Sequence, residues 1–218
     1  MIKNLIIKNL EECYNDIANI SKNTQIQIVS KQQNTENIET IIKQGHLLFG
    51  ENKIQEAKLK WPYLKEKYSN IKLHFIGSLQ KNKVKDVVNI FDAVESVDRY
   101  SLAEKLDLYE KKMNRKLKYY IQVNSGSEKQ KGGVSPEECI NLYKLCKKNL
   151  DINIVGLMCI PPLNEEPSLH FALISNLAKE LGLKEMSMGM SSDFKIAIEF
   201  GSTQVRIGQK IFGPRSKS

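Results

Sequence analysis

The segment QIQIVSK, residues 25–31, has the pattern of a short strand that ends on a lysine. Ile26 and Ile28 alternate with polar neighbours, which is the period of a strand. In a chain that then alternates helices and strands, a lysine at the carboxyl end of a strand lies where α/β barrels keep their chemistry. Lys31 is therefore a candidate for a covalent, Schiff-base role, and a solvated surface lysine is the alternative.

Strand-like runs recur along the chain, with helical patterns between them. The strands are predicted at Gln25–Ser30, His46–Phe49, Lys72–Ile76, Ala93–Ser96, Lys118–Val123, Ile152–Leu157, Glu185–Ser187 and Thr203–Ile207. The helices are predicted at Glu36–Lys43, Asn52–Lys60, Lys83–Asn89, Leu102–Lys112, Pro136–Lys148, Ser168–Leu181 and Asp193–Phe200, with caps at Asn34, Ser135 and Ser192.

This alternation implies parallel strands with crossover helices, and eight such units close a (β/α)8 TIM barrel. An open doubly wound sheet is the alternative, but no Gly-x-Gly-x-x-Gly segment follows the first strand. The 218 residues, 41% of them hydrophobic, bury one sizeable core but hardly two, so we expect a single domain over residues 1–218. Met1–Glu12 has the pattern of an amphipathic helix and lacks the apolar core of a signal peptide.

Charge and cysteine content narrow the function classes. The net charge of +8 is compatible with nucleic-acid binding. However, lysine is abundant throughout the chain, and no interleaved aromatic residues accompany it. We therefore expect no nucleic-acid partner, and we expect the cluster of Lys81, Lys83 and Lys85 to be solvated. No apolar run approaches the roughly 18 residues that would span a membrane. Four cysteines without metal-site spacing predict buried, reduced thiols in a cytoplasmic protein, and no metal.

A collinear series of motifs resembles the YggS/PROSC family of pyridoxal phosphate homeostasis proteins, which is related to the N-terminal domain of alanine racemase. The motifs are Phe49–Asn52, Gln55–Ala57, His74–Gly77, Ser96–Asp98, Lys131-Gly132, Gly156–Met158, Met186–Ser191, Val205–Gly208 and Ile211–Gly213, and the resemblance runs from Lys31 to Arg215. It implies a fold-type III barrel that binds pyridoxal 5′-phosphate (PLP).

The resemblance also implies where the cofactor lies. Lys31 would hold PLP as a Schiff base, and Ser191, Gly208 and the backbone of Gln209 would hold its phosphate. The loops after strands seven and eight are where barrel enzymes often bind a phosphate, which agrees with these positions. Arg206 resembles the arginine that meets the pyridine nitrogen in alanine-racemase-like enzymes, and a structural arginine that bonds carbonyl groups is the alternative.

Other motif residues have less defined roles. Asn52 is predicted either to bond the cofactor's hydroxyl or to cap the following helix, and Met158 either to line the pocket or to fill the barrel. His74 is expected to reach the barrel interior. Ser202 and Thr203 lie close enough in sequence to the phosphate-binding residues to join them.

The resemblance implies a PLP-binding protein that maintains intracellular PLP supply and amino-acid balance, with no established catalytic residue or turnover. PLP-dependent apoenzymes are the possible recipients. A weak PLP-dependent amino-acid racemase is the alternative, but racemisation needs a base on each face of the substrate carbon. Alanine racemases take the second base from an added domain and a partner subunit. The sequence ends at Ser218 without that domain, so we expect a monomer without the second base.

Overall fold

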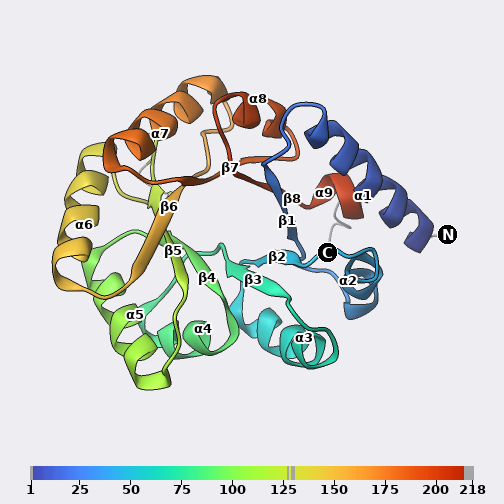
Figure 1. The fold of residues 1–218 in the computed structure, drawn as a ribbon, viewed down its shortest axis with the longest axis horizontal. Helices are drawn as coiled ribbons and strands as arrows, with labels where there is room; N and C mark the ends of the chain where they lie inside the picture. The colour runs from blue at the N-terminus through green and yellow to red at the C-terminus, as the bar shows by residue number, and fades with distance from the viewer. Residues whose placement is uncertain (1, 127, 129–130, 214–218) are drawn as a thin grey trace.

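The computed structural model describes residues 2–126, 128 and 131–213, in which eight parallel strands close into a barrel with helices around it (Figure 1). The strands are β1 (Gln25–Val29), β2 (Leu48–Glu51), β3 (Lys72–Phe75), β4 (Ala93–Val97), β5 (Lys118–Val123), β6 (Asn153–Cys159), β7 (Glu185–Met190) and β8 (Gln204–Ile207). The helical elements are α1 (Ile2–Ala18), α2 (Thr35–Ile42), α3 (Ile54–Lys67), η1 (Lys81–Lys83), α4 (Val84–Ile90), α5 (Tyr100–Met113), α6 (Pro136–Asn149), α7 (Pro167–Leu181), α8 (Phe194–Glu199) and α9 (Gln209–Phe212). Arg215, where the family resemblance ends, lies outside the described residues.

The first strand closes the barrel because it pairs on both sides. Ile28 of β1 lies opposite Phe49 of β2 and opposite Ile207 of β8, and both pairings are parallel. The predicted (β/α)8 barrel is confirmed, and the open sheet is wrong. Since every strand runs the same way, the carboxyl ends of all eight meet on one face of the barrel.

The predicted strands are confirmed in number and order, but only β5 begins and ends at the predicted residues, and β2, β6 and β7 differ from the prediction by two or three residues at one end or both. β2 begins and ends two residues later than the predicted His46–Phe49, and it includes the fully buried carboxylate of Glu51. β7 continues past the predicted end at Ser187 to Met190. This extension includes Gly189, whose φ of 95° lies in the left-handed region that favours glycine.

Local hydrogen bonds explain where several helices begin. Ser135 and Glu138 form a reciprocal capping box at the start of α6, with Pro136 in the first turn. The Asn34 side chain accepts the backbone N–H of Asn37 at the start of α2. The predicted caps at Ser135 and Asn34 are thus confirmed.

The predicted cap at Ser192 is wrong, because α8 begins one residue later. The N-cap position of α8 is Asp193, and the helix starts at Phe194. The Asp193 carboxylate accepts the backbone N–H of Met190 at 2.6 Å and so closes the β7–α8 turn. The Asp193 carboxylate therefore stabilises the carboxyl end of β7.

Helix α1 covers the outside of the barrel beside α9 and α2 (Figure 1). Its buried side chains recur at helical spacing: Ile6, Leu10, Cys13 and Ile17. Asn9 Nδ2 donates to the carbonyl oxygen of Ile211 at 2.9 Å, and Asp16 lies 2.5 Å from Lys210 Nζ. The amphipathic helix predicted in Met1–Glu12 is therefore present, continues to Ala18, and fixes the short helix α9.

The barrel interior is polar, whereas the apolar core lies mainly between strands and helices. Large side chains fill the outer layer completely: Phe49, Trp61, Phe75, Phe91 and Phe171. Inside the barrel, buried polar side chains from β1, β3, β4, β7 and β8 hydrogen-bond to one another across it: Gln27, His74, Glu95, Ser187, Gln204 and Arg206. Because barrel interiors are usually filled by branched apolar residues, this polar interior calls for a functional explanation.

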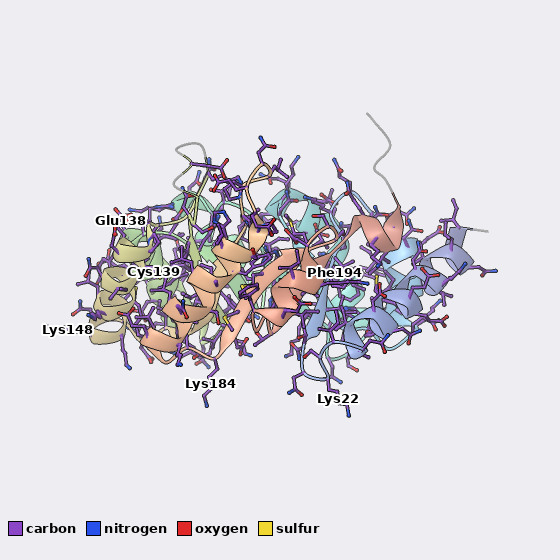
Figure 2. All side chains as sticks on the ribbon, turned by 90° about the horizontal axis from the view of Figure 1, so that it is seen from above. Lys22, Glu138, Cys139, Lys148, Lys184 and Phe194 are labelled. Carbon is purple, nitrogen blue, oxygen red and sulfur yellow. The ribbon has the colours of Figure 1, made fainter. Side chains whose placement is uncertain are left out.

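The lysine-rich surface is distributed over separate elements. Lys22, Lys148 and Lys184 are exposed and point outward at well-separated places in Figure 2. Lys22 precedes β1 and Lys184 precedes β7, so both lie at the amino-end face of the barrel. Within the described residues, none of the helices has the length and apolar character to cross a bilayer.

Candidate functional site

A pocket of about 600 Å³ opens at the carboxyl ends of the strands. Its wall comes from the loops after β1, β2 and β3, from β6, from the β7–α8 turn and from α9. The seven residues predicted to bind the cofactor all line it: Lys31, Asn52, Met158, Ser191, Arg206, Gly208 and Gln209. The fold thus brings residues from both ends of the chain into one cavity at the face where barrels carry their chemistry.

Lys31 enters the pocket from a tight turn directly after β1. The backbone N–H of Gln33 donates to the carbonyl oxygen of Ser30 at 3.1 Å and closes this turn. Gln32, next to the lysine, has a φ of 62°, a left-handed conformation that is uncommon for a residue with a side chain. The backbone at Lys31 is therefore held in a defined and unusual shape.

The part of the pocket wall that follows β7 and β8 has the character of an anion site. Ser191 contributes a hydroxyl from the β7–α8 turn, and Gly208 and Gln209 contribute backbone between β8 and α9. A Cβ added at Gly208 would lie 3.2 Å from the carbonyl oxygen of Val29, so glycine suits the close approach of these segments. Hydroxyl and amide donors with no acidic neighbour in the described wall suit a phosphate group.

Arg206 lies at the bottom of the pocket and is 4% exposed. One guanidinium nitrogen donates to the Ser187 carbonyl oxygen at 2.6 Å and to Ser187 Oγ at 2.7 Å, and the other donates to the Cys159 carbonyl oxygen at 2.7 Å. These bonds fix the guanidinium between β6 and β7. Arg206 thus bonds carbonyl groups and also lines the pocket.

Below Arg206, the carboxylate of Glu95 collects the polar groups of the barrel interior. The Ser187 hydroxyl donates to Glu95 Oε2 at 2.6 Å. Gln27 Nε2 and Gln204 Nε2 each donate to Glu95 Oε1 at 2.7 Å, and His74 Nδ1 lies 2.6 Å from the same oxygen. We call Gln27, His74, Glu95, Ser187, Gln204 and Arg206 the barrel network.

Glu95 is ionised in this network. Burial, the largest effect, raises the pKa of Glu95, but the hydrogen bond from His74 and the charges of His74 and Arg206 lower that pKa below its ordinary value. The carboxylate thus balances the buried guanidinium. Sequence reasoning missed Glu95, although a single charged residue in the apolar run Ala93–Val97 signals a partner inside the barrel. The prediction that His74 reaches the interior is confirmed.

The structure contradicts one of the two roles predicted for Asn52, that of capping the following helix, and leaves the bond to a cofactor hydroxyl as a prediction. Helix α3 begins at Ile54 with Lys53 at its cap and no side-chain cap bond, whereas Asn52 lines the pocket. A Cβ at Gly77 would lie 2.2 Å from the Asn52 carbonyl oxygen, so Gly77 permits this close approach. Met158 is buried beside Tyr120 and also lines the pocket, so it fills the barrel and forms part of the pocket wall.

Ser202 and Thr203 do not join the pocket, which corrects the sequence prediction. They precede β8, at the barrel face opposite Gly208. Ser202 Oγ donates to the Met188 carbonyl oxygen at 2.7 Å, and Thr203 Oγ1 accepts the backbone N–H of Met186 at 2.8 Å. Both hydroxyls therefore stabilise the β7–β8 contact.

The surroundings of the cysteines are those of core residues. All four are free and buried: Cys13, Cys139, Cys146 and Cys159. Burial raises the pKa of Cys139 and of Cys159 to about 12, so both stay as thiols at neutral pH. Across residues 2–126, 128 and 131–213, no group of three His, Cys, Asp or Glu side chains has the arrangement of a metal site.

The barrel and its lysine-bearing pocket define a barrel of the alanine racemase type: the family profile described as "Alanine racemase, N-terminal domain" matches residues 7–216. The chain belongs to the family of pyridoxal phosphate homeostasis proteins. The protein of that name from Vibrio alginolyticus is 37% identical over 207 residues, covering 90% of this chain and 89% of the relative. The human protein of that name is 38% identical over 210 residues, covering 87% of this chain and 76% of the relative.

A solved structure shows the same architecture with a cofactor. PipY of Synechococcus elongatus PCC7942, determined with PLP bound, superposes with a TM-score of 0.85 at 30% identity, covering 95% of this chain and 100% of that one. Without PLP, the same protein superposes with a TM-score of 0.89. The barrel of this chain is thus similar to that of a protein crystallised both with and without PLP.

Proposed function

We propose that this protein binds PLP in the pocket at the carboxyl ends of the strands, holds its aldehyde covalently on Lys31, and serves intracellular PLP homeostasis and amino-acid balance. The observation that carries this proposal is that the groups expected to bind PLP come together in one place. Lys31, Arg206 and the donors around Gly208 all line one pocket of about 600 Å³, a size that suits a small cofactor.

The residues present fit the chemical groups of PLP. The Lys31 amine supplies a nucleophile that condenses with an aldehyde, forming one C=N bond and releasing one water. Ser191 and the backbone at Gly208 and Gln209 supply neutral donors for a phosphate. Asn52 supplies an amide that hydrogen-bonds a ring hydroxyl. When bound, PLP supplies an electron-withdrawing ring conjugated to the nitrogen of an attached amine.

Arg206 limits what that ring can do. A guanidinium stays protonated in proteins and can only donate, so Arg206 keeps a facing ring nitrogen unprotonated. A ring whose nitrogen stays unprotonated would withdraw electrons weakly, which disfavours chemistry that needs a long-lived carbanion at the substrate carbon, such as transamination. The barrel network supports this role, because Glu95 and Ser187 hold the guanidinium in place and balance its charge. Holding PLP fits this electrostatic arrangement better than transamination does.

The test is covalent labelling of the protein by PLP. Purified protein is mixed with PLP, its absorbance is recorded, and the adduct is reduced with borohydride and mapped by peptide mass spectrometry. Lys31→Ala is compared with Lys22→Ala, which changes an exposed lysine at the opposite end of β1. The proposal expects a yellow adduct at Lys31 in the wild type and in Lys22→Ala, and its loss in Lys31→Ala. Equal labelling of surface lysines in all three proteins would refute it.

We further propose that the protein works as a cytoplasmic monomer that passes PLP to apoenzymes. Every group assigned above to PLP comes from this one chain, which agrees with a monomer. Four free thiols suit a reducing compartment. Sedimentation analysis tests the monomer, and fractionation of cells tests the compartment. Recovery of activity by a PLP-dependent apoenzyme mixed with loaded protein, faster than with free PLP at the same concentration, tests the transfer.

A further inference from the structure

The turn that carries Lys31, residues 30–33, rests on a buried ionic cluster that lies outside the pocket. Glu51 at the end of β2 and Glu56 and Lys60 on α3 form this cluster, which we call the clamp. The Lys60 side chain is 8% exposed and that of Glu51 is 0% exposed. Lys60 Nζ lies 2.7 Å from Oε1 of each carboxylate. A lysine is rarely buried without a partner, and here both partners also contact the turn.

Lys60 binds the turn on both sides of Lys31. Its Nζ donates to the carbonyl oxygen of Ser30 at 3.0 Å and, more weakly, to that of Gln33 at 3.4 Å. The same ammonium thus connects the residue before Lys31 and the residue two positions after it. A point charge that contacts both ends of a turn restricts the direction in which the enclosed side chain leaves the backbone.

The two carboxylates accept two further hydrogen bonds from the turn. Glu56 Oε1 accepts the backbone N–H of Gln32 at 2.5 Å. Glu51 Oε1 accepts the Ser30 hydroxyl at 2.8 Å, and it also accepts the indole N–H of Trp61 at 3.2 Å. Bonds to an ionised group are stronger than bonds between neutral groups, so these contacts restrain the turn effectively.

The conformation of Gln32 shows why such restraint is needed. Its φ of 62° belongs to the left-handed region, which residues with a Cβ occupy only where the surroundings fix them. The Glu56 contact is on the amide nitrogen of this same residue. Without it, the turn would relax towards common conformations, and the Lys31 side chain would leave the backbone in another direction.

We propose that the clamp positions Lys31 for its bond to the cofactor aldehyde, with Lys60 and Glu56 as positioning residues that touch neither the cofactor nor its reacting atoms. This inference rests on the proposed function of Lys31. The competing explanation is that the clamp only joins α3 to β2. If the clamp only stabilised the fold, its loss would weaken the binding of every ligand of the pocket alike. If it positions Lys31, its loss weakens the binding only of ligands that bond to the lysine.

The experiment compares two ligands that differ at one carbon. PLP carries the aldehyde that reacts with Lys31, and 4′-deoxypyridoxine 5′-phosphate carries a methyl group there and keeps the ring and phosphate. The variants are Lys60→Met and Glu56→Ala. The matched control is Lys65→Met, because Lys65 on the same helix also donates to a carboxylate, that of Asp92 at 2.6 Å, and to a carbonyl oxygen.

We expect Lys60→Met to weaken PLP binding and to slow borohydride-trappable adduct formation by about tenfold or more, because small misplacements of a reacting group are costly. The affinity for the deoxy analogue should stay within about twofold of wild type, since the ring and phosphate contacts persist. Glu56→Ala should act in the same direction, and it provides the test if Lys60→Met fails to fold. Lys65→Met should change the affinity for neither ligand.

Two results separate failure of this inference from failure of the proposed function. Equal weakening of both ligands, or unchanged PLP binding, in Lys60→Met and Glu56→Ala would overturn the positioning role while the wild type still labels Lys31. A wild type that binds both ligands equally and traps no PLP on Lys31 would overturn the proposed function itself. Hydrogen exchange of the peptide over residues 30–33 supplies a cofactor-free readout. Faster exchange in Glu56→Ala than in wild type and Lys65→Met is expected, and equal exchange contradicts the clamp.

Discussion

Replacing Glu95 by glutamine should destabilise the protein by about 2–5 kcal/mol, since removing one member of a buried charge pair leaves the other uncompensated. Glu95 is fully buried and its carboxylate accepts hydrogen bonds from Gln27, Gln204, Ser187 and His74. A glutamine oxygen can still accept from several of these donors. Its NH₂ group, however, faces the Ser187 hydroxyl, and the negative charge that balances the guanidinium of Arg206 is lost.

The assay is guanidinium denaturation at pH 7, followed by two optical probes to confirm one transition. Glu165→Gln is the matched control, because Glu165 lies 3.2 Å from His170 but is 53% exposed. Because the Glu165 carboxylate is largely in solvent, its interaction contributes about 0–1 kcal/mol, so the control should remain close to wild type. Combining Glu95→Gln with Arg206→Met should cost less than the sum of the single changes by about 1–3 kcal/mol, since the two charges are coupled.

A Glu95→Gln variant within about 0.5 kcal/mol of wild type would refute this reasoning, because that change is the size of an ordinary surface substitution. It would mean that Glu95 is already neutral in the folded protein and that the charge of Arg206 is balanced elsewhere. Low pH provides a second check. Since the folded pKa of Glu95 is lowered, its contribution is present above the ordinary pKa of a glutamate and is lost as the pH falls through the folded pKa.

Three further predictions concern other parts of the fold. Gly77→Ala should cost about 1–3 kcal/mol, because the new Cβ would lie 2.2 Å from the Asn52 carbonyl oxygen; an unchanged melting temperature contradicts this. Burial lowers the pKa of His46 to about 4, so the unfolded chain binds a proton from about pH 6.5 downward and the folded chain only near 4. Stability should therefore fall by up to about 3 kcal/mol as the pH drops through that window, and denaturation of His46→Gln at several pH values should show a smaller fall. Ser135→Ala should cost about 1 kcal/mol by removing the cap of α6, as measured by denaturant unfolding; equal midpoints would exclude that role.

The sequence predicts the barrel because each strand carries its own local signal. β5 has both predicted bounds, and the caps at Asn34 and Ser135 depend on residues only three positions away. The seven predicted pocket residues come together because they follow strand ends, and a closed parallel barrel places all such ends on one face.

The features that sequence reasoning missed depend on partners far away along the chain. Glu95 bonds Ser187, 92 residues later, and no period within either strand indicates that pairing. The bounds of β2 were wrong for a related reason, since Glu51 looks like a loop residue until Lys60 is seen to neutralise it. Buried charges contradict the local rule that strands alternate apolar and polar residues. Only the tertiary structure shows that each of these buried charges has a hydrogen-bonding or oppositely charged partner.

The described pocket wall contains one group that can take and return a proton during amino-acid chemistry, and this favours holding over turnover. Apart from Lys31, the side chains there are apolar, amide, hydroxyl or guanidinium groups. Arg206 keeps its proton, and the hydroxyls of Ser191 and Ser192 need a neighbouring base that the described wall does not supply. Racemisation requires proton transfer on both faces of the substrate carbon, and a single lysine reaches one of them. A positioned lysine that shares its pocket with an obligate donor is therefore suited to bind an aldehyde cofactor reversibly, which is the chemistry that storing and releasing PLP requires.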